Sequence, residues 1–359
     1  MKKSRWNVHE RIFLMLIILV LVLISLNVVK AKGWLFPEQP PIKISDNIIE
    51  LSSLTLEQKI GQMIIVHGAR YNLEAWKRVP VGGIHLFALK DAELFKKIIG
   101  DYQEDTTIPF FFSADLEGCL NPFANFQNFT PAIEVRTIEQ AFKKGQEEGK
   151  FLQELGFNLN YAPVVDLGDQ IWHCRSFPGD EQQVTKLAQA YLEGLKSEEV
   201  IGTIKHYPGK TLVVQDPHKY LVLAQISAAD VYPYENLKSE AELIMVSHII
   251  TTGEIDSKGQ PSVVSPSLIS QLQQNYSGLI ISDEINMLGL RQFYNSTDEM
   301  YLALFKAGND LILNFNDSPE EIYHMIEVIK EAVEKGEILE GRIDESVKKI
   351  LELKGFIVK

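Results

Sequence analysis

Short runs of hydrophobic residues recur along the chain, separated by polar stretches. The runs are nearly continuous rather than alternating, and β-branched and aromatic residues are frequent in them, as in strands that are covered on both faces. They lie at 61–67, 82–88, 109–116, 159–167, 202–208, 242–250, 278–285 and 310–316. The pattern predicts a buried parallel strand at each of these positions.

Amphipathic segments with helical spacing separate these runs, most clearly at 137–156, 181–198 and 319–336. A capping signal at Thr55 predicts a helix before the first strand, and "RIDESVKKILELKG" predicts a closing C-terminal helix. Strands alternating with helices favour an α/β fold, a (β/α)8 TIM barrel forming a single catalytic domain at 51–359. An open doubly wound sheet is the alternative, but no GxGxxG follows the first strand to support dinucleotide binding.

The N-terminus differs from the rest. A basic region, 1–11, precedes the uncharged apolar run "IFLMLIILVLVLISLNVV" at 12–29, and a Pro-rich linker follows at 30–50. The run just reaches the length that spans a bilayer, and its length and lack of charge argue against a buried soluble helix. The upstream basic residues predict a cytoplasmic N-terminus and an extracytoplasmic body on an uncleaved membrane anchor. The alternative is a signal peptide cleaved near Val29-Lys30-Ala31, which would release a secreted body.

Composition narrows the function further. The 359 residues carry a net charge of −13, which argues against a general nucleic-acid binder. The two cysteines, Cys119 and Cys174, either pair in an oxidising compartment or remain free thiols. No CxxC or HExxH pattern is present, so we expect no metal and no other cofactor. The oligomeric state is left open.

Ionisable residues gather where the predicted strands end. They are Asp115, Glu117, Asp166, Lys205, His206, His248, Asp283 and Glu284. In a barrel these positions meet at one face, the face that carries catalytic residues. Each residue alone is equally compatible with a structural ion pair, for example Asp166 with Lys205-His206. Together they favour an active site, because buried charges need partners or a task.

Eight short motifs occur in a characteristic order: "LTLEQKIGQM", "VGGIHLF", "ADLEG", "APVVDL", "RSF", "IKHYPG", "DPH" and "LIISDEINMLGL". In this order they resemble glycoside hydrolase family 3, and are most similar to its β-N-acetylglucosaminidases of the bacterial cell-wall-recycling type. The resemblance runs from about residue 51 to the end of the chain. It implies a retaining glycosidase on a (β/α)8 barrel, acting on a glycan that contains N-acetylglucosamine.

The resemblance also implies residue roles. Asp283 matches the nucleophile, and His218 matches an acid/base on a mobile loop, with Asp216 as its partner. The residues that match binders of the sugar hydroxyls are Asp115, Arg175, Lys205 and His206.

These roles are chemically reasonable in their own right. A glycosidase needs an anion for an oxocarbenium-like transition state and a proton donor for the leaving oxygen. An aspartate at a strand end is rigid, whereas a histidine titrates near neutrality and can both give and take a proton. The Asp216-x-His218 spacing lets the carboxylate orient the imidazole and stabilise its charged form.

Three positions depart from the family pattern. Cys119 replaces a glycine in "DLEGCLNPF" with no arginine nearby, "PGKTL" replaces a Gly-His-Gly continuation, and Glu284 follows Asp283 where an aspartate is usual. No proposed catalytic group is lost, so we expect an active enzyme with an unassigned aglycone. Cys119 and Cys174 both fall on loops beside the pocket, where a disulfide would brace Asp115 and Arg175.

Three other functions remain as alternatives. They are phosphorolysis of a β-glycoside with phosphate as acceptor, a β-glucosidase of the same family, and a sugar-binding module without turnover. An extracytoplasmic site favours water over phosphate as the acceptor. Retention of Asp283, Asp216 and His218 together argues against a module that only binds.

Overall fold

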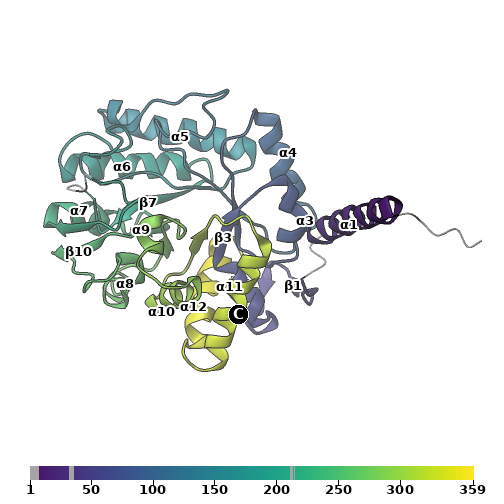
Figure 1. The fold of residues 1–359 in the computed structure, drawn as a ribbon. Helices are drawn as coiled ribbons and strands as arrows, with labels where there is room; N and C mark the ends of the chain where they lie inside the picture. The colour runs from purple at the N-terminus through teal and green to yellow at the C-terminus, as the bar shows by residue number, and fades with distance from the viewer. Residues whose placement is uncertain (1–7, 32–35, 211–212, 214) are drawn as a thin grey trace, which may run out of the picture.

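An eight-stranded parallel sheet forms the centre of the computed structural model, which describes residues 8–31, 36–210, 213 and 215–359 (Figure 1). The strands are β3 (Ile64–His67), β4 (Gly83–His85), β5 (Phe111–Ala114), β6 (Leu159–Asn160), β7 (Ile201–Tyr207), β9 (Leu243–Val246), β11 (Leu279–Ser282) and β12 (Ile312–Asn314). Their order in the sheet is β11-β9-β7-β6-β5-β4-β3-β12. A parallel bridge between Ile281 and Leu311 joins the two ends, so the sheet nearly closes into a barrel.

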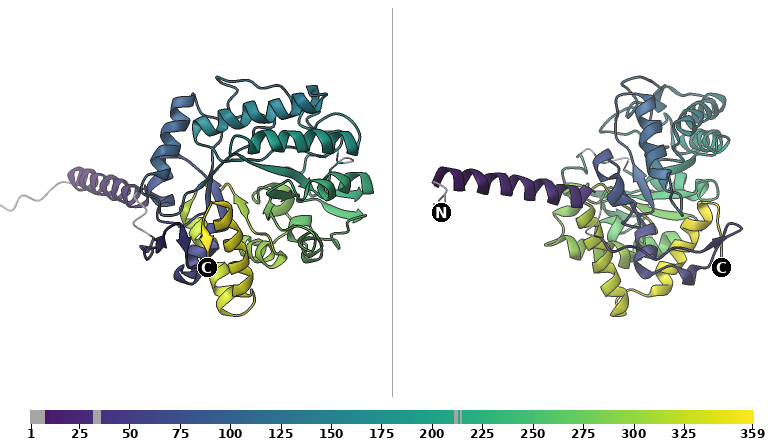
Figure 2. Two further views of the ribbon diagram at one scale, coloured as in Figure 1. Left: turned by 180° about the vertical axis from the view of Figure 1, so that it is seen from behind. Right: turned by 90° about the vertical axis from the view of Figure 1, so that its right-hand side faces the viewer.

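Helices follow the strands and surround the barrel (Figures 1 and 2). Those after the strands are α3 (Leu73–Trp76), α4 (Ala92–Gln103), α5 (Ile138–Leu155), α6 (Glu181–Lys196), α7 (Ala228–Leu237), α8 (Pro266–Gln273), α9 (Leu288–Arg291), α10 (Thr297–Ala307) and α11 (Pro319–Glu334). Helix α2 (Leu56–Gln62) precedes β3, and α12 (Glu340–Leu353) ends the barrel. The predicted (β/α)8 fold is confirmed.

Local sequence explains these elements. All four residues of β5 and of β11 are buried, as the continuous apolar runs predict for strands covered by helices on one side and core on the other. The capping signal at Thr55 is confirmed as a full capping box, in which Gln58 supplies the returning side chain. Thr137 and Gln140 form the same motif at the start of α5.

Helices α5 and α6 pack so closely that glycine is required where they cross. A Cβ on Gly145 would lie 2.1 Å from the Tyr191 carbonyl oxygen, and one on Gly194 would lie 2.3 Å from that of Phe142. Real Cβ atoms are not found so near to backbone oxygens. This contact fixes the two helices that follow β5 and β6, and Asp115 and Asp166 lie between these strands and their helices.

Two smaller sheets lie outside the barrel. One contains β1 (Ile44–Ser45), β2 (Ile48–Ile49) and β13 (Ile357–Val358), and the other pairs β8 (Leu223–Ile226) with β10 (Ile250–Gly253). The end of the predicted linker 30–50 is therefore folded against the C-terminus. Asp46 and Asn47 adopt positive φ angles of 50° and 64°, as the primed hairpin turns require, and so place β1 beside β2.

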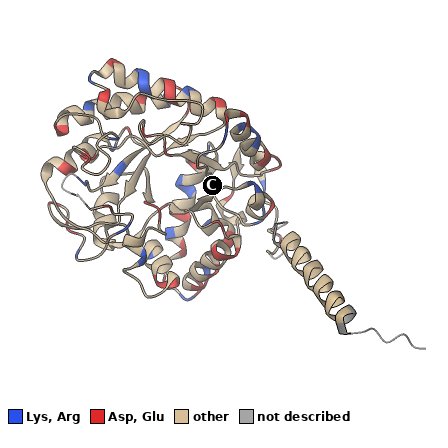
Figure 3. Ribbon diagram, turned by 45° about the horizontal axis from the view of Figure 1, so that its top comes forward, with Lys and Arg blue, Asp and Glu red and all other residues tan. Residues whose placement is uncertain are grey.

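The N-terminal apolar run forms α1 (Val8–Ala31), which projects away from the barrel (Figure 2). Its window Ile12–Val29 has a mean hydropathy of 3.2 and is not buried in the body. Figure 3 shows acidic and basic residues interspersed over the helices of the body, whereas the span Ile12–Val29 of α1 has none. Helix α1 is thus long and apolar enough to cross a membrane, a property that signal sequences share.

The crossing of α5 and α6 gives a stability prediction. Gly145→Ala should lower the free energy of unfolding by about 1–3 kcal/mol, because its methyl group has no space beside Tyr191. Gly100→Ala in α4 is the matched control, since no atom lies within 4 Å of its added Cβ. The free energy of unfolding of that control should rise by about 0.5–1 kcal/mol, because alanine has a higher helix propensity than glycine. Urea unfolding measures both, and equal gains at the two sites would contradict the packing argument.

Candidate active site

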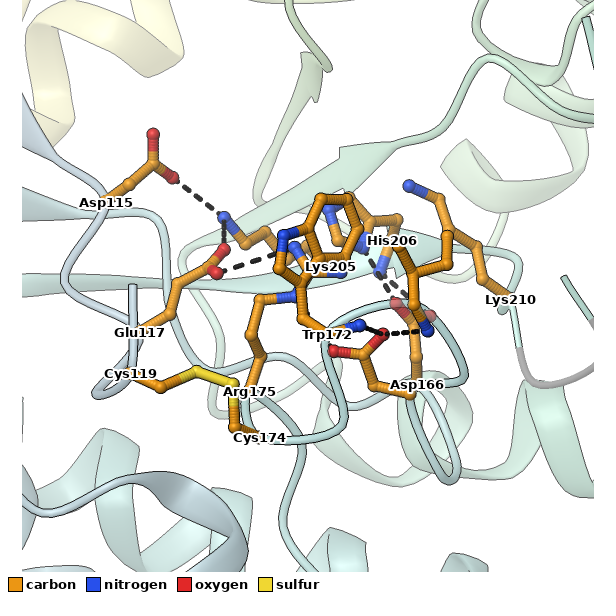
Figure 4. A network of polar contacts seen from close by, with 12 residues as sticks. Asp115, Glu117, Cys119, Asp166, Trp172, Cys174, Arg175, Lys205, His206 and Lys210 are labelled. Atoms are coloured by element: carbon orange, nitrogen blue, oxygen red, sulfur yellow. Dashed lines mark hydrogen bonds and ion pairs between the residues drawn. A yellow bond between two sulfur atoms is a disulfide. The ribbon is translucent and has the colours of Figure 1, made fainter. Parts of the chain in front are cut away.

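The predicted strand-end residues lie together at the carboxyl face of the barrel. Asp115 directly follows β5, Lys205 and His206 lie within β7, and Asp283 directly follows β11. Arg175 comes from the loop after β6, while Asp216 and His218 lie on the loop after β7. Figure 4 shows Asp115, Arg175, Lys205 and His206 as part of one polar network.

Lys205 is held between two acids. Its Nζ lies 2.8 Å from Asp115 Oδ1 and also forms an ion pair with Glu117. Burial acts to lower the pKa of Lys205, but the two carboxylates outweigh burial and raise it. The side chain of Asp115 remains 39% exposed, so this carboxylate still faces the pocket.

Glu117 also forms an ion pair with Arg175. Arg175 Nη1 lies 3.4 Å from Glu117 Oε2, and Nε donates to Asp169 Oδ2 at 3.0 Å. The guanidinium carbon lies 4.0 Å from the ring centre of Trp172, a cation–π arrangement visible in Figure 4. Each buried charge in this row therefore has an opposite neighbour, which offsets the cost of removing it from water.

His206 forms the ion pair with Asp166 that was considered from the sequence, whereas Lys205 does not pair with Asp166. His206 Nδ1 lies 2.8 Å from Asp166 Oδ2, and the His206 backbone N–H donates to Oδ1 at 3.2 Å. Burial, reinforced by Lys210, lowers the pKa of His206 well below its ordinary range. A neutral ring that donates from Nδ1 to Asp166 leaves Nε2 as a hydrogen-bond acceptor.

Asp283 lies beside a buried lysine. Its Oδ2 lies 3.7 Å from Lys210 Nζ, its Oδ1 accepts the Glu284 backbone N–H at 2.9 Å, and its side chain is only 14% exposed. Burial acts to raise the pKa of Asp283, but Lys210, followed by His248 and His206, outweighs it and lowers the pKa. Asp283 is therefore ionised at neutral pH.

The carboxylate of Glu284 is held by hydrogen bonds from neighbouring loops. One of its carboxylate oxygens accepts hydrogen bonds from Asn286 Nδ2 at 2.7 Å and from the Phe315 backbone N–H at 3.2 Å. His248 Nε2 lies 2.7 Å from the Glu284 carbonyl oxygen, and burial lowers the pKa of His248. This departure from the family pattern thus ties the loop after β11 to the loop after β12.

Asp216 and His218 form a close pair. His218 Nδ1 lies 2.7 Å from Asp216 Oδ1, which also accepts the His218 backbone N–H at 3.0 Å. Burial acts to raise the pKa of Asp216, but the hydrogen bonds from His218 outweigh it and lower the pKa. Because Asp216 occupies Nδ1, the other nitrogen, Nε2, is the one available for proton transfer.

The loop that carries this pair contacts two neighbours. The Leu288 backbone N–H donates to the His218 carbonyl oxygen at 3.0 Å, and the Trp172 ring lies edge-on at 5.3 Å between centroids. Part of the "GKTL" segment, residues 211 and 212, lies outside the described residues, as does residue 214.

Four further residues belong to this site without having been assigned a role from sequence: Trp172, Asp169, Lys210 and His85. His85 is buried against Phe315, its Nε2 lies 3.8 Å from Asp115 Oδ2, and burial lowers its pKa to about 4. Lys210 had a signal in the departure "PGKTL". His85 had a signal too, because it lies in the motif "VGGIHLF" and ends β4. Trp172 and Asp169 had none, because their roles depend on how the loop after β6 folds.

The loops after β5 and β6 are also joined covalently. Cys119 and Cys174 form a disulfide with a Cα–Cα distance of 6.0 Å, next to Glu117 and Arg175 (Figure 4). The described residues hold no group of three or more His, Cys, Asp or Glu side chains arranged to bind a metal.

A cluster of paired acids and bases at the carboxyl face of a (β/α)8 barrel is typical of the active site of a barrel enzyme. Comparison with known proteins identifies the family. Residues 55–353 match the glycosyl hydrolase family 3 N terminal domain, so the chain belongs to this family and is a glycosidase. The family resemblance seen in the motifs is confirmed.

Three relatives illustrate the match. A β-hexosaminidase of Idiomarina loihiensis is 31% identical over 71% of this chain and 83% of its own length. The β-hexosaminidase LpqI of Mycobacterium bovis is 26% identical over 84% of this chain and 83% of its own. The crystal structure of a family 3 glycosyl hydrolase from Mycobacterium smegmatis superposes with a TM-score of 0.78 at 25% identity, covering 85% of this chain and 98% of that one.

Proposed function

We propose that this glycosidase is a retaining β-N-acetylhexosaminidase that removes terminal β-N-acetylglucosamine. The observation that carries the proposal is an ionised, nearly buried Asp283 whose pKa is lowered by Lys210 first and by His218 among others, together with an Asp216 carboxylate that holds Nδ1 of His218. An anion and a proton donor are the two groups that a retaining glycosidase requires. The substrate class is supported by the relatives named β-hexosaminidase.

In the first half-reaction Asp283 attacks the anomeric carbon and forms a glycosyl ester. The bond to the leaving oxygen breaks, and that oxygen takes the proton of His218 Nε2. Asp216 stabilises the imidazole in its charged form and fixes its orientation, as the aspartate of a hydrolytic triad does. Low exposure of Asp283 strengthens its attraction to the positive charge that develops on the sugar.

In the second half-reaction water attacks the anomeric carbon while His218 Nε2 accepts its proton. The bond to Asp283 breaks, and the electron pair returns to the carboxylate. A histidine suits both steps, because the same imidazole nitrogen can donate a proton in one step and accept a proton in the other.

The remaining pocket residues are proposed to hold the sugar hydroxyls. Asp115 offers a half-exposed acceptor, and His206 offers Nε2 as a second acceptor. Lys205 and Arg175 supply donors, and their acidic partners fix the direction of these donors. We further propose a peptidoglycan-derived or related glycan as the natural source of the sugar, supported by the motif resemblance.

The body is proposed to lie outside the cytoplasm, anchored by α1. Support comes from the apolar span Ile12–Val29 with basic residues before it, and from the disulfide, which persists in oxidising compartments. The protein should therefore sediment with membranes, resist extraction by salt, and show no titratable thiol when denatured without reductant. Two thiols per chain would contradict the disulfide, and a soluble full-length chain would contradict the anchor.

Removing the proposed nucleophile tests the mechanism. Asp283→Asn keeps the size of the side chain but cannot form the ester, so kcat/KM for an aryl β-N-acetylglucosaminide should fall by about 10⁴-fold or more. Asp256→Asn, at an exposed ion pair with Lys258, is the control and should retain full activity. Full activity of Asp283→Asn would refute the assignment.

Removing the proposed acid tests its role separately. His218→Ala should slow substrates with poor leaving groups by about 10²–10⁴-fold, while an activated aryl glycoside needs little protonation and should be affected much less. His324→Ala is matched, since its side chain is also 50% exposed and also paired with an aspartate. The slope of log kcat/KM against leaving-group pKa is the measurement, and an unchanged slope would remove His218 from the acid role.

A further inference from the structure

Lys210 is a buried cation at the proposed nucleophile. Its side chain is 8% exposed, and its Nζ lies 3.7 Å from Asp283 Oδ2. Within the part of the chain that the structure describes, neither residue has another ion pair within 4.0 Å. Figure 4 shows Lys210 beside His206 and Asp166.

The backbone holds Lys210 in place from both sides. The preceding Gly209 has a φ of +120°, and a Cβ there would lie 2.7 Å from the Asp230 Cβ. Asp230 in turn accepts the Ser227 backbone N–H at 2.9 Å in the capping box of α7. After Lys210, its carbonyl oxygen accepts the Val213 backbone N–H at 2.9 Å. Lys210 therefore lies shortly after the end of β7, before the part of the loop that carries His218.

Asp283 is the carboxylate that pairs with the buried Lys210 ammonium. Burial lowers the pKa of Lys210 below its ordinary range, although Asp283, followed by Asp166, opposes this effect. Asp166 is already engaged by the Nδ1 and backbone N–H of His206. When Asp283 is an anion, the buried ammonium is compensated; when Asp283 is a neutral ester, the ammonium loses its ion-pair partner.

We propose that Lys210 is a positioning residue that acts through Asp283 to destabilise the glycosyl-enzyme and so speed its hydrolysis. This inference rests on the proposed retaining mechanism. Formation of the ester consumes the negative charge beside Lys210. When water attacks the anomeric carbon and the ester C–O bond breaks, the electron pair returns to Asp283 and restores the ion pair.

The same contact works against the first half-reaction, because Lys210 stabilises the carboxylate that must attack. Removing the charge should therefore favour formation of the ester and slow its breakdown, and both effects increase the fraction of enzyme that carries sugar. A group that served only to hold the loop would not change this balance in that direction.

The test compares Lys210→Met with Lys210→Arg during turnover of an activated aryl β-N-acetylglucosaminide. Rapid acid quenching followed by intact-protein mass spectrometry measures the fraction of glycosyl-enzyme. The ratio of glycosyl-enzyme to free enzyme should rise by about tenfold or more in Lys210→Met, the lower limit for loss of an opposite charge at this distance. KM should fall together with kcat, because the intermediate accumulates.

Two variants serve as controls. Lys210→Arg retains the charge and should resemble the wild type, and so should Lys196→Met, which removes an exposed lysine paired with Glu242 on the surface. If Lys210→Met does not fold, Lys210→Gln provides a neutral polar side chain for the same measurement. An adduct fraction in the neutral variant at or below that of the wild type would overturn the proposal, as would equal accumulation in Lys210→Arg.

Asp283→Asn in the same series distinguishes a failure of the retaining mechanism from a failure of the role of Lys210. If that variant still turns over substrate, the retaining mechanism itself fails. If it is inactive and the wild type forms an adduct, while Lys210→Met gives no increase, only the role of Lys210 fails.

Discussion

Pairing of buried charge is the constraint on which this pocket depends. An ammonium or carboxylate removed from water costs several kcal/mol unless an opposite charge and hydrogen bonds compensate it. At the carboxyl face of the barrel, acids and bases alternate from Asp115 through Lys205 and Glu117 to Arg175. The two members of each of these pairs come from different strands or loops. Closing the barrel is therefore what brings the compensating charges together. Fold and site are therefore stabilised by the same contacts.

This constraint divides the pocket into two parts. The wall made by β5, β6 and β7 is rigid, since its charged side chains are paired, Lys205, Glu117 and Arg175 are buried, and the disulfide between Cys119 and Cys174 braces the loops. The Asp216–His218 pair is more exposed and is attached through a contact with Leu288. Such a division suits a reaction in which one group must be aimed at a carbon while another exchanges a proton with two different oxygens.

The sequence predicted the barrel because apolar runs and amphipathic segments report burial directly. It also placed Asp115, Lys205, His206 and Asp283 at one face, since all parallel strands end there. The pairing of acids with bases was not predictable from the sequence, because Glu117 and Asp166 occupy similar strand-end positions. Lys205 pairs with Glu117 rather than Asp166 because of the strand register and the path of the loops. Trp172 and Asp169 were missed for the same reason. The hairpin at Ile44–Ile49 was hidden in a polar, Pro-rich stretch, and its strands are only two residues long.

A covalent bond between Asp283 and the sugar requires two displacements at the anomeric carbon and hence net retention of configuration. Proton NMR of the first product released from an aryl β-N-acetylglucosaminide, recorded before mutarotation, tests this directly. The β-anomer is the predicted first product. Initial release of the α-anomer would mean a single displacement by water and would contradict the role assigned to Asp283.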